Sequence, residues 1–232
     1  MKNKLLKMIS STIFIVAEIG LLIAVMATSG NLNNWLCFSS VLLAFVFSLM
    51  WINFKNKNFL TQFALFFTVI ADIFLVLISP QNQAVAMTAF SIVQILYLLR
   101  ILKETNNKKI NLINLIVRVV MIVLVEIITI IVVKDKIDYV CLISMFYYTN
   151  LILNLVFACV NFKRSPLLAI GLVFFLLCDT FVGLSSAIDV YITVSHNSWL
   201  YRLVFADFNF IWFFYIPSQT LLALSLIKCK KN

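Results

Sequence analysis

The sequence predicts an all-α, polytopic membrane protein with about eight transmembrane helices. Three observations predict this fold: 63% of the 232 residues are hydrophobic, the mean hydropathy is +1.07, and only 12% of residues are charged. A soluble domain of this length needs far more polar surface, so the bilayer must solvate most of the exterior. Only helices and closed barrels satisfy the backbone inside a bilayer, and continuous apolar runs of about 20 residues favour helices.

Short polar segments separate the hydrophobic runs and set the predicted helix boundaries. These segments leave no room for a soluble domain, so we expect residues 1–232 to form a single transmembrane helical domain. The one longer connection, around His196 to Tyr201, is predicted to be a loop. The predicted helices cover residues 7–27, 34–53, 59–79, 83–103, 111–133, 137–161, 166–189 and 205–227.

The distribution of lysine and arginine predicts the orientation. With the N-terminus inside, the outer segments hold only Lys134, Lys136 and Arg202, and Arg118 lies within a span. Because positive charge accumulates on the cytoplasmic side, both termini are predicted to be cytoplasmic and the helix count even. This topology accounts for the net charge of +9, so we expect no nucleic-acid partner. The inner basic residues are Lys2, Lys4, Lys7, Lys55, Lys57, Arg100, Lys103, Lys108, Lys109, Lys163, Arg164, Lys228, Lys230 and Lys231.

Five charged residues lie in the interior of predicted spans, away from the terminal turns, where each costs about 2.5–3.5 kcal/mol. For three of them, Glu18, Arg118 and Glu126, a structural role is favoured. Arg118 lies near the inner end of its helix, from where its side chain can snorkel to the membrane surface. Glu126 is eight residues further on, about 12 Å along the axis, which is too far for a direct pair with Arg118.

The other two, Asp72 and Asp179, have matching surroundings. Each has Phe five positions before it, a small residue directly before it, Phe two after and Leu five after. Each lies 13 residues from the inner start of its predicted helix, about 20 Å deep. The two helices run in the same direction, so the sequence predicts a parallel 4+4 internal repeat that places both aspartates at one depth.

The helix that follows each aspartate carries polar residues near the midplane. Gln94 and Tyr97 are spaced i, i+3, and Tyr215 and Gln219 are spaced i, i+4, so each pair shares one helical face. One interpretation is interhelical hydrogen bonding, worth about 0.6–2 kcal/mol for each group. The other is a polar cavity that opens toward the outer half and holds all six residues. Two carboxyl groups in a dry cavity do not both ionise readily, and the resulting asymmetry suits acid–base chemistry.

Several of these segments resemble one family. Gly171–Thr180 resembles the G-x-x-x-F-x-x-S-D stretch of the YhhN family of membrane lysoplasmalogenases, and Phe214–Leu224 is similar to its closing Y-x-x-x-Q-x-L-I-A helix. Ala71–Leu75 resembles its G-D-x-x-L, and Phe90–Tyr97 resembles its F-x-x-x-H-x-x-Y. The resemblance spans roughly residues 59–227. The chain departs from the pattern at Gln94, where the family usually has histidine, at Ala71, where it has glycine, and in lacking a Lys-Pro near the second helix.

The resemblance implies hydrolysis of the vinyl ether bond of lysoplasmalogens to a fatty aldehyde and a glycerophospho-base. One of the catalytic residues Asp72 and Asp179 would be the acid, and the other would stabilise an oxocarbenium-like cation and position water, as in glycosidases. Gln94, Tyr97, Tyr215 and Gln219 would orient the water, the carboxyl groups and the substrate. The implied substrate is a lysophospholipid that reaches the site sideways from the bilayer. No cofactor or metal is implied. The composition favours a bacterial source and hence the cytoplasmic membrane as the location.

Two alternatives remain open at the level of sequence. The chain is also compatible with a small-solute or lipid transporter or binding protein whose aspartates bind protons or cations. The change at Gln94 leaves a catalytically inactive family member as a second alternative. A metal-dependent hydrolase is excluded because it needs several histidines and His196 is the only one. A serine hydrolase is excluded for the same reason, and because the sequence contains no G-x-S-x-G motif.

Overall fold

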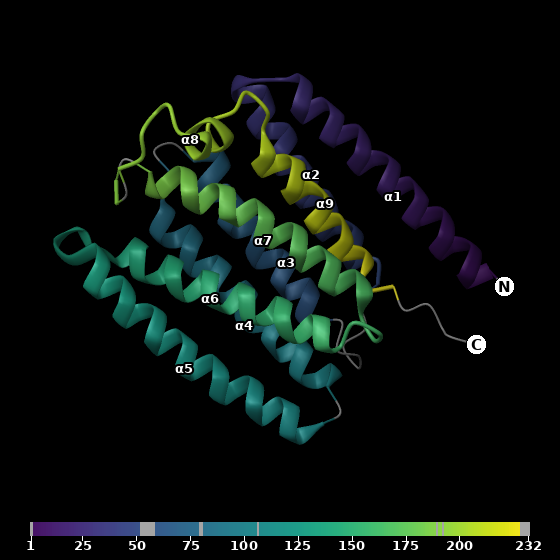
Figure 1. Ribbon diagram of the computed structural model, residues 1–232. Helices are drawn as coiled ribbons and strands as arrows, with labels where there is room; N and C mark the ends of the chain where they lie inside the picture. The colour runs from purple at the N-terminus through teal and green to yellow at the C-terminus, as the bar shows by residue number, and fades with distance from the viewer. Residues whose placement is uncertain are drawn as a thin grey trace.

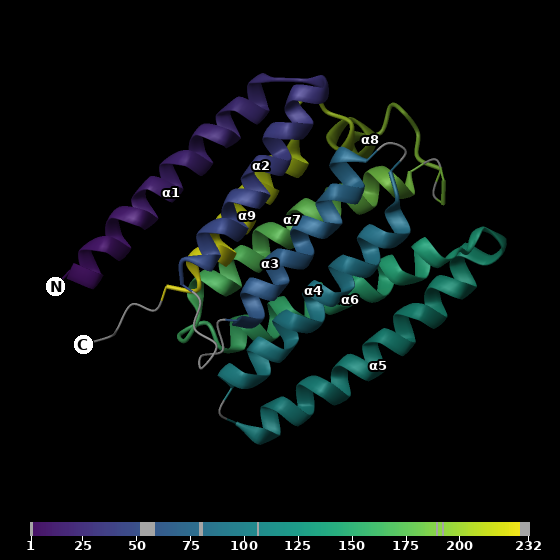
Figure 2. The same cartoon turned by 180° about the vertical axis from the view of Figure 1, so that it is seen from behind.

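A computed structural model describes residues 2–51, 59–78, 81–105, 107–188, 190–191 and 193–227, and its elements are all helices (Figures 1 and 2). Within these residues, seven helices are long and apolar enough to cross a membrane. An eighth apolar helix, α9 (Phe210–Leu224), is shorter. The fold class predicted from the sequence is thereby confirmed. The seven are α1 (Lys2–Ala27), α2 (Gly30–Leu49), α3 (Phe59–Asp72) with its continuation η1 (Ile73–Leu77), α4 (Gln83–Glu104), α5 (Lys108–Val133) with η2 (Lys134–Lys136), α6 (Tyr139–Val160) and α7 (Pro166–Ala187).

Several segments differ from the predicted boundaries. α2 covers Gly30–Leu49, so it begins and ends four residues before the predicted range 34–53, and α1 begins five residues before the predicted start. The connection predicted as a loop contains a short helix, α8 (Trp199–Val204), which begins where the Ser198 hydroxyl accepts a hydrogen bond from the Tyr201 N–H. The last helix begins five residues later than predicted, because the Asn209 side chain caps it by accepting from the Trp212 N–H. Both starts are set by short polar side chains that satisfy free N–H groups, a signal that hydrophobicity alone does not carry.

Six helices form a closed ring in the order α2, α3, α4, α6, α7 and α9, in which each packs against the next and α9 packs against α2. The ring has two layers. Helices α2, α3 and α4 make one, and α9, α7 and α6 make the other, with α3 and α7 in the middle of their layers (Figures 1 and 2). The two middle helices carry Asp72 and Asp179. Because the layers face each other, two aspartates at equal depth lie close together.

The remaining long helices flank the ring. α1 packs on α2 and α9 at one side, and α5 packs on α6 at the other (Figure 1). The Ser40 hydroxyl of α2 donates to the buried Glu18 carboxyl of α1 over 2.5 Å, in agreement with the structural role expected for Glu18. First-half helices α1–α4 therefore occupy positions equivalent to those of α5, α6, α7 and α9, the arrangement that a parallel 4+4 repeat produces.

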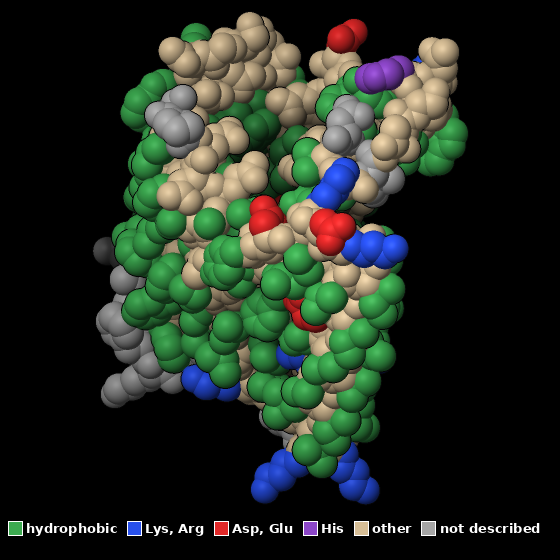
Figure 3. All heavy atoms as spheres, turned by 90° about the vertical axis from the view of Figure 1, so that its left-hand side faces the viewer, with side chains coloured by type: hydrophobic (Ala, Val, Ile, Leu, Met, Phe, Trp, Pro, Cys, Tyr) green, Lys and Arg blue, Asp and Glu red, His purple; other side chains and the backbone are tan. Residues whose placement is uncertain are grey.

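The surface and the ends of the bundle fit a membrane. Hydrophobic side chains cover most of the helical surface on the face drawn in Figure 3, and charged ones are few there. α1 begins and α9 ends at the same end of the bundle (Figure 1), which the positive-inside rule makes the cytoplasmic end.

Arg100 closes that inner end between helices. Its guanidinium donates to the Thr61 hydroxyl of α3 over 2.5 Å and to the Ser225 hydroxyl beyond α9 over 2.7 Å. It also pairs with Glu104 over 3.1 Å, one turn along α4. Only 2% of Arg100 is exposed, so its charge is met by protein groups rather than by water.

α3 does not continue as a regular α-helix beyond Asp72. Residues Ile73–Leu77 form a π-helical segment, closed by a hydrogen bond from the Ile78 N–H to the Ile73 carbonyl over 3.0 Å. The sequence predicts an uninterrupted helix over 59–79, because neither glycine nor proline marks the change. Short π segments occur often beside functional sites, where they widen the helix and redirect side chains.

Candidate active site

Asp72 lies at the end of α3 and is 2% exposed. The Tyr215 hydroxyl of α9 donates a hydrogen bond to its Oδ2 atom over 2.8 Å. The two residues are 143 positions apart in the chain, so the contact joins the two predicted repeats. Tyr215 is itself buried and held by ring contacts with Phe175 at 5.7 Å and Trp212 at 5.3 Å. The phenol therefore has a fixed position from which to orient the carboxyl group.

Asp179 faces the interior from α7. The Tyr147 hydroxyl of α6 donates to its Oδ2 atom, and the neighbouring Cys178 thiol donates a second hydrogen bond. The carboxyl groups of Asp72 and Asp179 lie close enough to interact electrostatically, and the Cys178 thiol interacts with both. Asp179 is partly exposed while Asp72 is buried, so the two carboxyl groups differ in both donors and access.

A row of buried aromatic rings separates the two tyrosines. Phe90 stands 5.6 Å from the ring of Tyr147 and 6.1 Å from that of Phe175, and Phe175 in turn contacts Tyr215. All four rings are at most 5% exposed. The row fixes both phenols and makes the surroundings of the carboxyl groups apolar, which strengthens every charge interaction within them.

Gln94 extends the polar interior from α4 toward α6. Its backbone carbonyl and its side-chain oxygen both accept hydrogen bonds from the Asn154 amide, over 2.8 and 2.9 Å. The Gln94 side chain also lies beside the Tyr147 hydroxyl. Tyr147 thus connects Asp179 to Gln94, and Asn154 connects Gln94 to the next group in the interior.

That next group is Arg118 of α5. Its guanidinium donates to the side-chain oxygens of Asn150 over 2.6 Å, Asn154 over 3.0 Å and Asn114 over 3.1 Å. Arg118 is 4% exposed, so the expectation that it snorkels to the membrane surface is wrong: three buried asparagines solvate its charge in the interior. Glu126, as expected, does not pair with it, and within the described residues the Glu126 Oε2 atom has no hydrogen-bond partner.

Tyr97 and Gln219 are fully buried but do not bond to either aspartate within the described part of the chain. The Tyr97 hydroxyl, the Gln94 Nε2 atom and both polar atoms of the Gln219 amide have no hydrogen-bond partner there. Buried polar atoms cost about 1–3 kcal/mol each when unpaired. Because these atoms belong to three of the six residues predicted for the site, the interior holds hydrogen-bonding capacity that a polar guest molecule can use.

The structure thus brings together Asp72, Asp179 and Tyr215 directly, and reaches Gln94 through Tyr147. Sequence reasoning missed Tyr147, Asn150 and Asn154. These residues are spaced i, i+3 and i+7 on the predicted helix 137–161, the same one-face pattern that identified Gln94 with Tyr97. The pattern is visible in the sequence, but it lies on the helix before Asp179 rather than on the helix that follows it.

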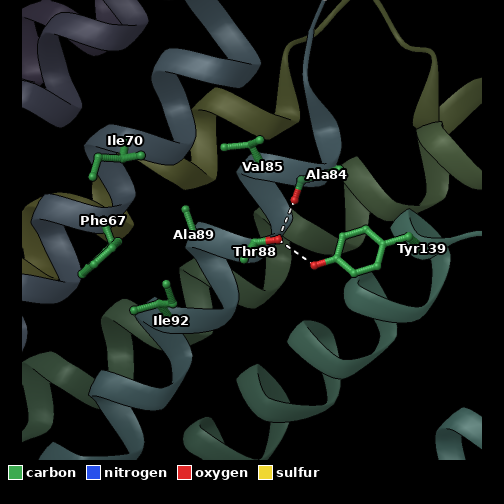
Figure 4. A pocket seen from close by; sticks show the side chains of 8 residues that line it. All are labelled: Phe67, Ile70, Ala84, Val85, Thr88, Ala89, Ile92 and Tyr139. Carbon is green, nitrogen blue, oxygen red and sulfur yellow. Dashed lines mark hydrogen bonds between the residues drawn. The ribbon is translucent and has the colours of Figure 1, made fainter.

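An open groove of ≈ 350 Å³ lies next to this interior, between α3 and the outer half of α4 (Figure 4). Its lining is almost entirely apolar and includes Phe67 and Ile70, which precede Asp72 on the same helix. At its far wall, the Thr88 hydroxyl and the Tyr139 hydroxyl are 2.9 Å apart (Figure 4). Thr88 donates to the Ala84 carbonyl over 2.7 Å, so Tyr139 is the donor in the second bond.

Comparison with known proteins gives a family and no individual relative. No curated protein and no solved structure shows significant similarity to the chain. The family model of the YhhN family matches residues 32–226, a region that contains all six ring helices apart from the first residues of α2. With the match covering most of the sequence, the chain belongs to the YhhN family.

Proposed function

We propose that this protein is a membrane-embedded hydrolase that cleaves the vinyl ether bond of lysoplasmalogens, located in the bacterial cytoplasmic membrane. Family membership supports the activity class, because the YhhN family is known for lysoplasmalogenase activity. The observation that carries the proposal is the facing pair Asp72 and Asp179, two electrostatically coupled carboxyl groups that each accept a hydrogen bond from a tyrosine of another helix.

The two carboxyl groups are suited to different roles. Asp179 accepts from Tyr147 and from the Cys178 thiol, whereas Asp72 accepts from Tyr215 alone. Donated hydrogen bonds stabilise the charged form of a carboxyl group, so Asp179 is the better carboxylate and Asp72 the better proton donor. We assign Asp72 as the acid and Asp179 as the group that stabilises the cation and positions water.

The reaction then follows from these roles. Asp72 transfers its proton to the outer carbon of the O–CH=CH bond, and the electron pair of that double bond forms the new C–H bond. The carbon attached to oxygen becomes an oxocarbenium ion, which the Asp179 carboxylate stabilises. Water adds to this carbon and loses a proton, which restores the acid. The resulting hemiacetal loses its hydroxyl proton and breaks its bond to the glycerol oxygen, which takes up a proton, giving the fatty aldehyde and the glycerophospho-base.

The surrounding groups supply positioning. The Tyr97 hydroxyl and the Gln219 amide have free hydrogen-bonding capacity for the water or the head group. The apolar groove between α3 and α4 fits the alkenyl chain, because a lipid-facing groove inside a bilayer is filled by hydrocarbon rather than by water. Hydrolysis is favoured over transport because Arg100 ties α3, α4 and the end of α9 together at the inner end, where a through route would have to open.

The proposal is tested with purified protein in detergent and an alkenyl lysophospholipid, with aldehyde release as the readout. We expect activity in the wild type and its loss in Asp72→Asn and in Asp179→Asn. Asp135→Asn, an exposed outer-loop change of the same chemistry, is the control and is expected to be fully active. No aldehyde from the wild type with any ether head group would refute the enzymatic function. Activity that survives both aspartate changes would refute the site.

A second measurement tests the proton transfer itself. In deuterium oxide, with the aldehyde reduced in place to the alcohol so that it cannot exchange further, the product should carry one deuterium on the carbon next to the former aldehyde carbon. A product without deuterium at that carbon would contradict protonation of the vinyl ether as the reactive step.

A further inference from the structure

A second hollow lies at the cytoplasmic end of the bundle, far along the helices from the outer groove. It has a volume of ≈ 810 Å³ and is formed by the connection between α4 and α5 on one side and the connection between α6 and α7 on the other. Lys108 lines it from the start of α5, and Lys163 and Arg164 line it from the second connection. Three cationic side chains, one at the start of α5 and two in the connection between α6 and α7, therefore line one space.

Among the described residues, none that lines this hollow carries a carboxylate. Glu104 is the only acidic residue in the predicted inner segments of the sequence. Its Oε1 atom accepts from the Arg100 guanidinium over 3.1 Å, and its Oε2 atom accepts from the Ser165 hydroxyl over 2.7 Å. Both carboxylate oxygens of Glu104 therefore have protein partners, and Glu104 does not line the hollow. Within the described residues neither Lys108 nor Lys163 has a hydrogen bond or ion pair, so their ammonium groups are available to an anion.

The walls of the hollow are held together by protein contacts. The Asn161 amide donates to the Thr105 hydroxyl over 2.6 Å, across the two connections. Arg164 donates to the Glu104 carbonyl, which fixes its guanidinium at the rim. The Asn107 side chain caps α5 by accepting from the Lys109 and Ile110 N–H groups, so the positive end of that helix also points to this region. A preformed site of this kind loses little conformational entropy on binding.

We propose that this hollow binds a phosphate group at the cytoplasmic membrane surface, carried by an anionic phospholipid head group or by a soluble phosphate compound. The positive-inside rule explains why basic residues lie at this end, but not why residues of two loops line one concave space without an acid. Basic pockets between transmembrane helices on the cytoplasmic side are typical sites for anionic head groups. The site is separate from the aspartates and does not depend on the proposed hydrolysis.

Cys159 provides a probe inside the hollow. It lines this space and is exposed, whereas Cys37, Cys141 and Cys178 are buried. In a Cys229→Ser background, the rate at which a neutral maleimide labels Cys159 reports whether the hollow is occupied. One arm uses protein in detergent with added inorganic phosphate. The other uses nanodiscs of phosphatidylcholine alone or mixed with phosphatidylglycerol.

We expect phosphate or phosphatidylglycerol to slow labelling in the parent protein. Each lysine near a membrane surface contributes about a fivefold gain in anion affinity, so Lys108→Gln with Lys163→Gln should raise the concentration for half-protection about 30-fold. Lys109→Gln removes the same charge from the next residue, outside the lining, and should raise that concentration by no more than about fivefold. Protection by phosphatidylglycerol alone identifies the head group as the source, and protection by inorganic phosphate identifies the free anion. Equal protection in the parent and the double variant, or none in either arm, would overturn the proposal.

Discussion

Substitutions at Tyr147 and Tyr148 form a matched pair of variants that distinguishes a role in the reaction from a role in packing. The two tyrosines are neighbours on α6 and donate to neighbours on α7: Tyr147 bonds to Asp179, and the Tyr148 and Thr180 hydroxyls are 2.8 Å apart. Changing either tyrosine to phenylalanine removes one interhelical hydrogen bond and keeps the ring. Such bonds average about 0.6 kcal/mol in membranes and reach about 1.7 kcal/mol, so both variants should lose a similar, small amount of stability.

Their effects on the reaction should differ. A hydrogen bond to a charged group is worth about 1.5–3 kcal/mol, which corresponds to about 10- to 150-fold in rate when the charge acts in the transition state. Tyr147→Phe should therefore lower kcat for aldehyde release by this factor, while Tyr148→Phe should stay within about twofold of wild type. The assay compares kcat per monodisperse protein, with thermal unfolding in detergent measured on the same samples. Equal kcat values for the two variants at equal stability would refute the assignment of Asp179 to the reaction.

Three further predictions concern the scaffold. Gly171→Ala should destabilise the protein by up to about 2 kcal/mol, because the new Cβ would stand 3.0 Å from the Leu222 side chain of α9. Gly183→Ala on the same helix meets nothing within 4 Å and should be neutral or stabilising by up to about 1 kcal/mol. Thermal unfolding distinguishes the two variants. Arg100→Gln should lower the stability by about 2–4 kcal/mol in the same assay, since Thr61, Ser225 and Glu104 lose a buried partner. Glu18→Gln should leave aldehyde release within about twofold of wild type, because an amide oxygen still accepts from Ser40; a tenfold loss would contradict its structural role.

The sequence predicted the parts of the site that depend on depth along a helix. The equal depth of Asp72 and Asp179, and the place of Tyr215 near the midplane of the helix that returns after Asp179, follow from residue spacing and the rise per residue. Which helices become neighbours depends on side-chain packing across the ring, which spacing along one helix does not contain. For this reason the spacing did not show that Tyr215, from the other repeat, donates to Asp72, or that Tyr147 donates to Asp179.

The error at Arg118 has a similar origin. Its position near the inner end of a span predicted snorkelling, which assumes that the membrane surface is the nearest polar environment. Asn114 lies one turn before it, and Asn150 and Asn154 lie on the helix packed against it. The polar residues of two helices together provide the solvation, and a prediction that treats each helix separately does not see it.

The π-helical segment after Asp72 bears on how two matched aspartates come to differ. A parallel repeat begins with two equal copies, and equal copies would give both aspartates the same backbone and the same chemistry. Here α3 widens directly after its aspartate, at Ile73–Leu77, while α7 continues as a regular α-helix through Asp179 to Ala187. The local symmetry ends at the two aspartates, although the ring around them keeps it. Removing one residue from the π segment should restore a regular α-helical turn and make the two halves more alike. A single-residue deletion can therefore test whether the difference between the halves matters for activity.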